Sequence, residues 1–317
     1  MSSRPPAEAG PAAVTVACPD CGSDAHEPLH AAHDRWFDVP GTYRYARCAA
    51  CGLTYLRDRP APAALAAHYP PDYVRRGRGP AWLHAWFRAY DLRRRVRLVR
   101  RLAGRGGRVL DVGCAAGDFL CAARDAGLVV AGVEPAPWAA AAAQAHGLPV
   151  WPTAVAAARL PHAAFDVATL WDVVEHLDRP GDDLAHVAAA VRPGGWLVVT
   201  TPVLDGWEAR LWRTRWPGWD TPRHLVVFER ATLQRVVERA GFRPAGWRYL
   251  SEGYLLTAMA AAQACKVAAP PPVARAVHAV LHARPVRLAM QPLFAVLDRA
   301  LGGGWVTLVA QRRTGDA

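Results

Sequence analysis

The sequence predicts an α/β fold built on a doubly wound parallel sheet. The stretch from Arg108 to Leu120 begins as an apolar strand, turns at glycines and continues as a helix from about Asp118. Beyond it, strand-like and helix-like segments alternate, and parallel strands are normally joined by right-handed helical crossovers. Two C-x-x-C pairs precede this region and indicate a metal-binding unit. A chain of 317 residues accommodates one large domain with such additions.

Composition points away from disorder and secretion. Hydrophobic residues make up 52% of the chain, enough for a sizeable core. The formal charge of +11 comes almost wholly from arginine, and Lys266 is the only lysine. We attribute this charge to coding bias, so we do not favour a nucleic-acid partner. The N-terminal residues lack the apolar segment of a signal peptide. The run from Tyr254 to Ala269 is shorter than the ~20 residues that span a bilayer. We expect a cytoplasmic protein.

The first unit carries four cysteines in two pairs. Cys18 and Cys21 form one pair, Cys48 and Cys51 the other, and a glycine follows each pair. Two such turns predict a closed tetrathiolate site, which suits structural Zn²⁺. An intervening histidine could replace a thiolate, and two hairpins with free thiols are the alternative; the histidines are His26, His30 and His33.

The linker after this unit predicts a helix. From Trp82 to Leu102, apolar residues recur at helical spacing while arginines cover the other side. We interpret the arginines as a solvated face, with contact to a phosphorylated or membrane substrate as the alternative. The stretch from His68 to Tyr73 is rich in proline and tyrosine, and it is either a plain linker or a cover for a nearby site.

The glycine turn after the first core strand predicts a nucleotide site. Gly113 and Gly117 let the backbone approach a ligand, and the next helix presents free N–H groups. A second apolar strand, Val129 to Val133, ends in Glu134, whose carboxylate can accept both hydroxyls of a ribose. A tight turn without a ligand remains the alternative for the glycines alone.

Two later segments extend the pattern. "FDVATLWDVVEHL" (165–177) is a strand with an acidic, histidine-bearing exit, and "RPGGWLVVTTP" (192–202) is a turn and another strand. Together with "LDVGCAAGDFL" and "GVEP", this series resembles the motifs of class I S-adenosylmethionine (SAM)-dependent methyltransferases. The resemblance extends roughly from Val109 to Arg313 and departs at Ala115, where the family usually has a glycine. The cysteine segment resembles the zinc ribbon of a bacterial branch that includes sugar C-methyltransferases.

The resemblance implies a seven-stranded Rossmann-like sheet whose last strand, near 304–310, is antiparallel and inserted between the fifth and sixth. It also implies the SAM-binding residues, which are Asp111, Gly113, Gly117, Phe119, Glu134, Pro135, Trp171 and Asp172. The chain then divides into a disordered tail (1–13), a zinc ribbon (14–60), a helical linker or cap (61–107), a SAM-binding core (108–250), a helical insertion (251–303) and the last core strand with a tail (304–317).

Two histidines are candidates for a general base. His176 stands at the exit of the fourth strand, and His224 ends a tryptophan- and arginine-rich loop, 203–224. Imidazole titrates near neutral pH and suits proton removal; a structural histidine is the alternative for each. We expect the loop to form a wall of the substrate site or, alternatively, to pack on the body. We expect no catalytic metal.

The expected function is methyl transfer from SAM to a small-molecule, sugar or lipid-linked acceptor. One alternative is an RNA methyltransferase that uses the zinc ribbon to bind substrate, and another is a SAM-binding protein without chemistry. The insertion at 251–303 could serve as a lid, a dimer surface or a peripheral membrane contact. The sequence identifies neither the acceptor atom nor the oligomeric state.

Overall fold

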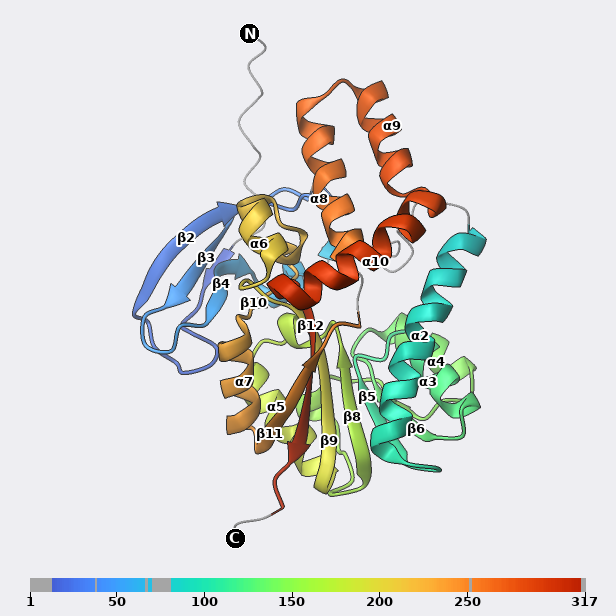
Figure 1. Ribbon diagram of the computed structural model, residues 1–317. Helices are drawn as coiled ribbons and strands as arrows, with labels where there is room; N and C mark the ends of the chain where they lie inside the picture. The colour runs from blue at the N-terminus through green and yellow to red at the C-terminus, as the bar shows by residue number, and fades with distance from the viewer. Residues whose placement is uncertain (1–12, 38, 66–67, 70–80, 251–252, 315–317) are drawn as a thin grey trace.

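The computed structural model describes residues 13–37, 39–65, 68–69, 81–250 and 253–314. Two β-sheets and a helical layer organise the described chain (Figure 1). The expected tail at 1–13 and most of the tyrosine-rich stretch at 68–73 lie outside these residues.

The smaller sheet is antiparallel and holds the cysteine pairs. Its strands run in the order β1-β4-β3-β2, with bounds Ala13–Thr15 (β1), Thr54–Pro60 (β4), Tyr43–Cys48 (β3) and His26–Ala32 (β2). A fifth strand, β10 (Val226–Val227), pairs with β4 although it lies far along the chain. The ribbon and the core therefore share a sheet.

The larger sheet has seven strands in the order β11-β12-β9-β8-β5-β6-β7. Their bounds are Phe242–Arg248 (β11), Trp305–Arg312 (β12), Val191–Pro202 (β9), Phe165–Trp171 (β8), Arg108–Val112 (β5), Val129–Val133 (β6) and Val150–Trp151 (β7). Strands β5 to β9 are parallel, and β12 is antiparallel to both β9 and β11. The expected seven-stranded sheet with its inserted last strand is confirmed.

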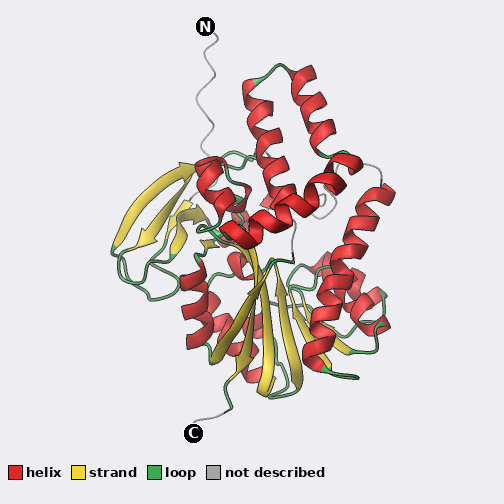
Figure 2. Ribbon diagram, in the orientation of Figure 1, coloured by secondary structure: helices red, strands yellow, loops and turns green. Residues whose placement is uncertain are grey.

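Helices cover both faces of this sheet (Figure 2). Val109, Val167 and Val198 face α2, α3 and α4, whereas Leu110 and Val199 face α5 and α7. The bounds are Ala81–Ala103 (α2), Asp118–Asp125 (α3), Pro137–Ala145 (α4), Pro180–Ala190 (α5) and Arg230–Arg239 (α7). Strands buried on both faces explain why the core strands are nearly continuous apolar runs.

A glycine follows the end of three of these helices. Gly127, Gly147 and Gly241 all have positive φ, between 72° and 95°, which is the conformation of a helix C-terminal cap. Helix α2 buries Val96 and Val99 against the sheet, while Arg93, Arg97 and Arg100 are exposed, in keeping with a solvated arginine face.

The remaining helices lie beyond the carboxyl ends of the parallel strands. Three of them form the insertion, namely α8 (Gly253–Ala268), α9 (Pro271–Leu281) and α10 (Arg284–Leu301). Short helices complete the connections, namely α1 (Pro62–Leu65), α6 (Trp207–Trp212) and the 3-10 turns η2 (Val155–Ala157), η3 (Val174–His176), η4 (Arg213–Arg215) and η5 (Pro217–Trp219). Across the described residues, none of the helices combines the length and apolarity needed to cross a bilayer.

Candidate active site

The turn after β5 requires glycine at two positions. Gly113 and Gly117 have φ of 72° and 87°. A Cβ on Gly113 would lie 2.5 Å from a methyl of Val173, and one on Gly117 would lie 2.3 Å from Leu148. Ala115 also has a left-handed φ of 48°, so it occupies glycine-like backbone with a methyl group attached. The turn thus keeps its shape despite this departure.

Glu134 closes the turn from the end of β6. Its Oε2 accepts from the backbone N–H of Ala115 at 2.9 Å, and its Oε1 accepts from that of Ala136 at 2.8 Å. Burial raises the pKa of this carboxyl, while the two N–H donors lower it. Each carboxylate oxygen retains a second lone pair, which a ribose hydroxyl could use. Pro135 follows directly and is exposed at the start of the loop.

Asp111 lies beneath this turn, inside the sheet. The side chain is 3% exposed and accepts from the Thr169 hydroxyl at 2.6 Å. Burial raises the pKa of this carboxyl to about 7, and Thr169 and Arg95 oppose that rise. Asp111 therefore braces the neighbouring strands β5 and β8 below the site.

Asp172 leaves β8 in a strained conformation, with φ of 59°. Trp305 donates its Nε1–H to Oδ1 at 2.6 Å, and Arg95 lies 3.5 Å from Oδ2. Non-glycine residues with positive φ concentrate at functional sites. The structure therefore adds Arg95 and Trp305 to the residues expected at this edge.

Aromatic rings border the same edge. The Arg95 guanidinium lies 4.8 Å from the centroid of the Trp171 ring, and Phe119 meets Trp171 edge-on at 5.3 Å. The structure thus brings together Trp171, Asp172 and Phe119 from two elements, beside the glycine turn.

The two candidate bases are neighbours. The rings of His176 and His224 lie 4.7 Å apart, between centroids. His224 Nδ1 lies 2.8 Å from the Gly218 carbonyl oxygen, which can only accept a hydrogen bond. Nδ1 therefore carries the proton, and Nε2 keeps its lone pair when the ring is neutral. Nε2 lies 3.9 Å from Glu175 and 3.8 Å from Asp220. Both rings are therefore placed to hold or accept a proton.

Burial sets the charge state of this cluster. Desolvation lowers the pKa of His176 to about 4, with His224 adding to the shift, and desolvation also lowers the pKa of His224. Both shifts favour the neutral imidazole at pH 7. Desolvation and the nearby Asp172 raise the pKa of Glu175 well above its usual range.

His176 has two neighbours at Nδ1. The hydroxyl of Tyr69 lies 3.1 Å from this nitrogen, and the carbonyl oxygen of Arg223 lies 2.9 Å from it.

Arg223, directly before His224, is fully buried between two carboxylates. Its guanidinium donates to Asp34 at 2.7 Å and 3.1 Å and to Asp220 at 2.6 Å and 3.0 Å. Asp34 belongs to the ribbon region and also contacts His68 at 3.1 Å. This ion-pair network joins the N-terminal unit to the loop that carries His224.

Tyr45 makes a second connection of the same kind. Its hydroxyl, fully buried, lies 2.7 Å from the Trp219 carbonyl oxygen and 3.1 Å from that of His224. Trp216 and Trp219 are themselves buried, at 1% and 9% exposed. For these two tryptophans the packing alternative holds, because they fill the junction between ribbon and core.

The four cysteines converge in the ribbon. The Sγ atoms of Cys18 and Cys51 lie 3.6 Å apart, those of Cys21 and Cys48 lie 3.5 Å apart, and all four fall within 4.8 Å of one another. Zn–S bonds of about 2.3 Å give sulfur separations near ~3.8 Å in a tetrahedron. The donor set therefore fits Zn²⁺.

The turns and histidines around the cysteines agree with such a site. The backbone N–H of Gly22 donates to the carbonyl oxygen of Cys18 at 2.9 Å, and that of Gly52 donates to the carbonyl oxygen of Cys48 at 2.8 Å. The two turns therefore have the same hydrogen bond. His30 stacks on Tyr45 and meets Trp219 at 4.3 Å, which gives it a packing role, while His26 bonds the Asp24 carbonyl at 2.8 Å.

Comparison with known proteins agrees with this geometry. A family model described as a methyltransferase domain matches residues 84–245. The ubiquinone biosynthesis O-methyltransferase of Bordetella avium (strain 197N) is 33% identical over 120 residues, which cover 34% of this chain and 48% of that protein. The enzyme of the same name from Burkholderia orbicola (strain MC0-3) is 36% identical over 104 residues, covering 30% and 44%. The chain thus matches about half the length of these curated relatives.

A solved structure shows the same fold. One chain of the complex between the Haloferax volcanii Trm112 methyltransferase activator and the putative methyltransferase aligns with a TM-score of 0.50 and 15% identity. The alignment covers 73% of this chain and 92% of that one. Because the family model spans half of the chain and the sheet has the expected strand order, this protein belongs to the class I SAM-dependent methyltransferases.

Proposed function

We propose that this protein transfers the methyl group of SAM to a small-molecule, sugar or lipid-linked acceptor. The observation that carries the proposal is the position of three groups at the carboxyl ends of the parallel strands. They are the glycine turn with Glu134, the aromatic edge at Trp171, and the paired imidazoles of His176 and His224. Ligands of open α/β sheets bind at this edge. The names of the curated relatives support a small-molecule acceptor.

The residues of the turn are suited to hold SAM. Gly113 and Gly117 set the left-handed backbone of the turn. Glu134 would offer acceptors for the ribose hydroxyls, and Asp172 and Trp171 would border the methionine part. When bound, SAM supplies an already activated methyl group on its sulfonium. What the protein must add is alignment of the acceptor and removal of its proton.

His224 is our candidate for proton removal. Its Nδ1–H is fixed on a carbonyl, and its Nε2 is unprotonated in the neutral ring that burial favours. After protonation, Asp220 would stabilise the imidazolium through a favourable charge at 3.8 Å. His176, 4.7 Å away between ring centroids, is the alternative.

Calorimetry and methyl-transfer assays test the proposal together. Purified protein is titrated with SAM, then incubated with labelled SAM and a panel of phenols, nucleotide sugars, prenylated quinols and tRNA. Glu134→Ala should weaken SAM binding roughly 10- to 100-fold, since a lost charged hydrogen-bond pair costs about 1.5–3 kcal/mol. Glu238→Ala, on the opposite face of the sheet, is the control. Unchanged SAM affinity in Glu134→Ala, or transfer only to tRNA, would contradict the proposal.

A further inference from the structure

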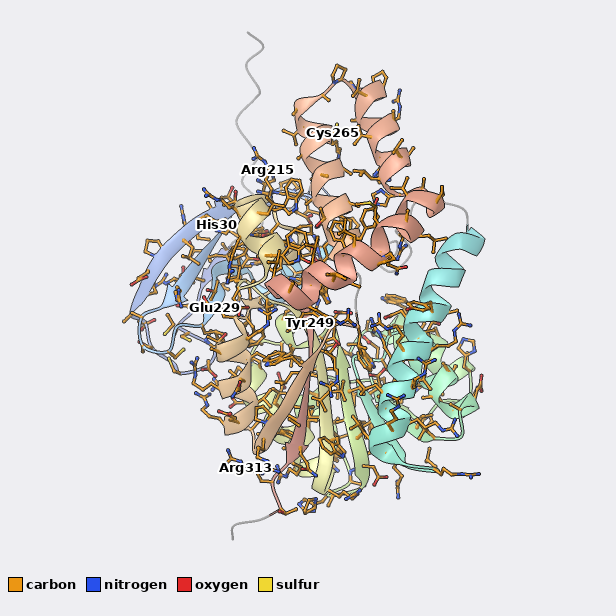
Figure 3. All side chains as sticks on the ribbon, in the orientation of Figure 1. His30, Arg215, Glu229, Tyr249, Cys265 and Arg313 are labelled. Carbon is orange, nitrogen blue, oxygen red and sulfur yellow. The ribbon has the colours of Figure 1, made fainter. Side chains whose placement is uncertain are left out.

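The hairpin of α8 and α9 extends away from the body of the molecule. Figure 1 shows its tip as the part of the described chain furthest from the sheet, and Figure 3 places Cys265 near that tip and Arg313 at the opposite end. The tip is apolar and exposed: Val267 is 78% exposed, and three successive exposed prolines, 270–272, lie at the start of α9.

The outer side of α9 continues this apolar surface. Val273 and Val280 are 49% and 58% exposed, and their seven-residue spacing places them on one helix face with the exposed Ala276 between them. Among the described residues of α9, Ala274 is the buried one. We call Val267, the three prolines, Val273, Ala276 and Val280 the hairpin surface.

The charge around the hairpin surface has one sign. Between residues 253 and 304 the sequence has a single acid, Asp298, and five basic residues, which are Lys266, Arg275, Arg284, Arg287 and Arg299. Asp298 is 4% exposed and accepts from the Trp207 Nε1–H at 3.0 Å, so it contributes little to the surface. Lys266 and Arg275 are exposed and flank the tip.

The hairpin also lies at the same end of the molecule as the candidate active site. Helix α8 contacts α6 and η5, which follow the carboxyl end of β9, and α10 leads directly into β12 beside Asp172. A surface to which the hairpin binds would therefore face the end of the sheet that carries the candidate active site.

We propose that the hairpin surface docks this protein on an anionic membrane. Exposed apolar residues flanked by basic ones match the acyl and headgroup layers of such a surface, each basic residue adding to the attraction. A second copy of the chain is a poorer occupant, since it would bring the same basic residues face to face. The inference goes beyond the proposed chemistry and does not require it.

Vesicle flotation tests the proposal on the full-length protein. Vesicles of phosphatidylcholine with one-third phosphatidylglycerol should carry the protein upward, and pure phosphatidylcholine vesicles should carry much less. Val273→Asp with Val280→Asp should abolish flotation. Lys266→Gln with Arg275→Gln should weaken it roughly 30-fold, since one basic residue near an anionic surface is worth about five-fold.

The control is Val129→Asp, an equally exposed valine (56%) at the start of β6, at the other end of the sheet. The melting temperature and SAM affinity of each variant are measured to show that the variant is folded. The proposal is overturned if wild-type protein stays unbound with anionic vesicles, if the hairpin variants float like the control, or if light scattering shows a dimer that the Val273→Asp, Val280→Asp variant dissociates.

Discussion

Arg223 carries its charge in the interior, with no exposed side-chain surface, between the carboxylates of Asp34 and Asp220. Burial alone would raise the pKa of the Asp34 carboxyl, yet hydrogen bonds from His68 and Arg223 hold it well below its usual range. An acid with a depressed pKa stabilises the fold above its unfolded pKa of about 4, and this contribution is lost as pH falls through the folded pKa. The network therefore holds throughout the neutral range.

Arg223→Lys tests how much this network stabilises the fold. A lysine cannot donate to two carboxylates with a planar fork, and breaking a buried pair costs about 3–5 kcal/mol. We expect a fall of about 2–4 kcal/mol in the free energy of unfolding, measured by urea denaturation. Arg100→Lys, on the exposed side of α2, should change it by less than about 0.5 kcal/mol. Equal stability of the two variants would show that the network is not structural.

His224→Gln tests the proposed base. Because burial lowers the pKa of His224 below its usual 6.5, wild-type kcat/KM should be independent of pH above about pH 6.5 and fall at lower pH. We expect kcat to fall ~10²–10⁴-fold in the variant with SAM affinity unchanged. The measurement is a pH–rate profile with the acceptor found in the panel, and exposed His146→Gln is the control. Near-normal turnover in His224→Gln would transfer the role to His176.

At the scale of elements, the helical insertion is fixed at its base by two buried acids. Glu208 in α6 accepts from the Gly304 N–H at 2.6 Å, and Asp298 in α10 lies near it. Burial raises the pKa of Glu208 to about 7, with Asp298 adding to the rise. Folding thus favours the protonated acid, so stability falls as pH rises from about 4.5 to 7, and the loss is complete above pH 7.

Glu208→Gln should remove this pH dependence. The amide keeps an oxygen for the Gly304 N–H and cannot ionise, so the variant should be more stable than wild type at pH 8, by about 1–3 kcal/mol. Thermal melts at intervals between pH 5 and pH 8 measure the slope. Glu238→Gln should retain the wild-type slope, and a Glu208→Gln slope identical to it would refute the prediction.

The sequence predicted well the elements whose pattern lies within their own residues. Buried parallel strands are apolar runs, so β5, β6 and β8 could be predicted. The pairing of β10 with β4 could not, because a two-residue strand has no period of its own. The tryptophan loop shows the same limit: its composition suggested a substrate wall, while packing against the ribbon buries Trp216.

The site divides in the same way. Gly113, Gly117 and Glu134 follow consecutive strands at fixed spacing, so their meeting follows from the strand order. Arg95 and Trp305 reach Asp172 from 77 and 133 residues away, and Asp34 reaches Arg223 across 189. Contacts over such separations depend on how whole elements pack, which no local pattern encodes.

At the scale of the whole molecule, the ribbon should influence the active site. Tyr45 lies three residues before Cys48 and bonds the carbonyl of His224. Loss of metal through Cys48→Ser should therefore lower the melting temperature by roughly 10 °C or more, at 2–4 °C per kcal/mol. It should also reduce acceptor turnover more than SAM affinity, since the glycine turn lies on other strands.

Elemental analysis, thermal melts, SAM calorimetry and a methyl-transfer assay measure the metal content, stability, SAM affinity and turnover on one preparation. Cys265→Ser, in the helical insertion, is the matched control and should retain one zinc per chain. A Cys48→Ser variant with full zinc content and stability would count against the metal site; one that loses zinc while keeping full turnover would separate the ribbon from the chemistry.

The pairing of β10 with β4 also has a consequence during synthesis. Residues 13–60 leave the ribosome before the core strands, and Val226–Val227, which complete their sheet, are made 166 residues after Pro60. At about 5–20 residues per second, the nascent ribbon spends roughly 10–30 s without this strand and without the loop that covers Tyr45. Four thiolates closed on a metal would hold its turns together through that interval. The ribbon is thus completed only after most of the parallel core strands have been made.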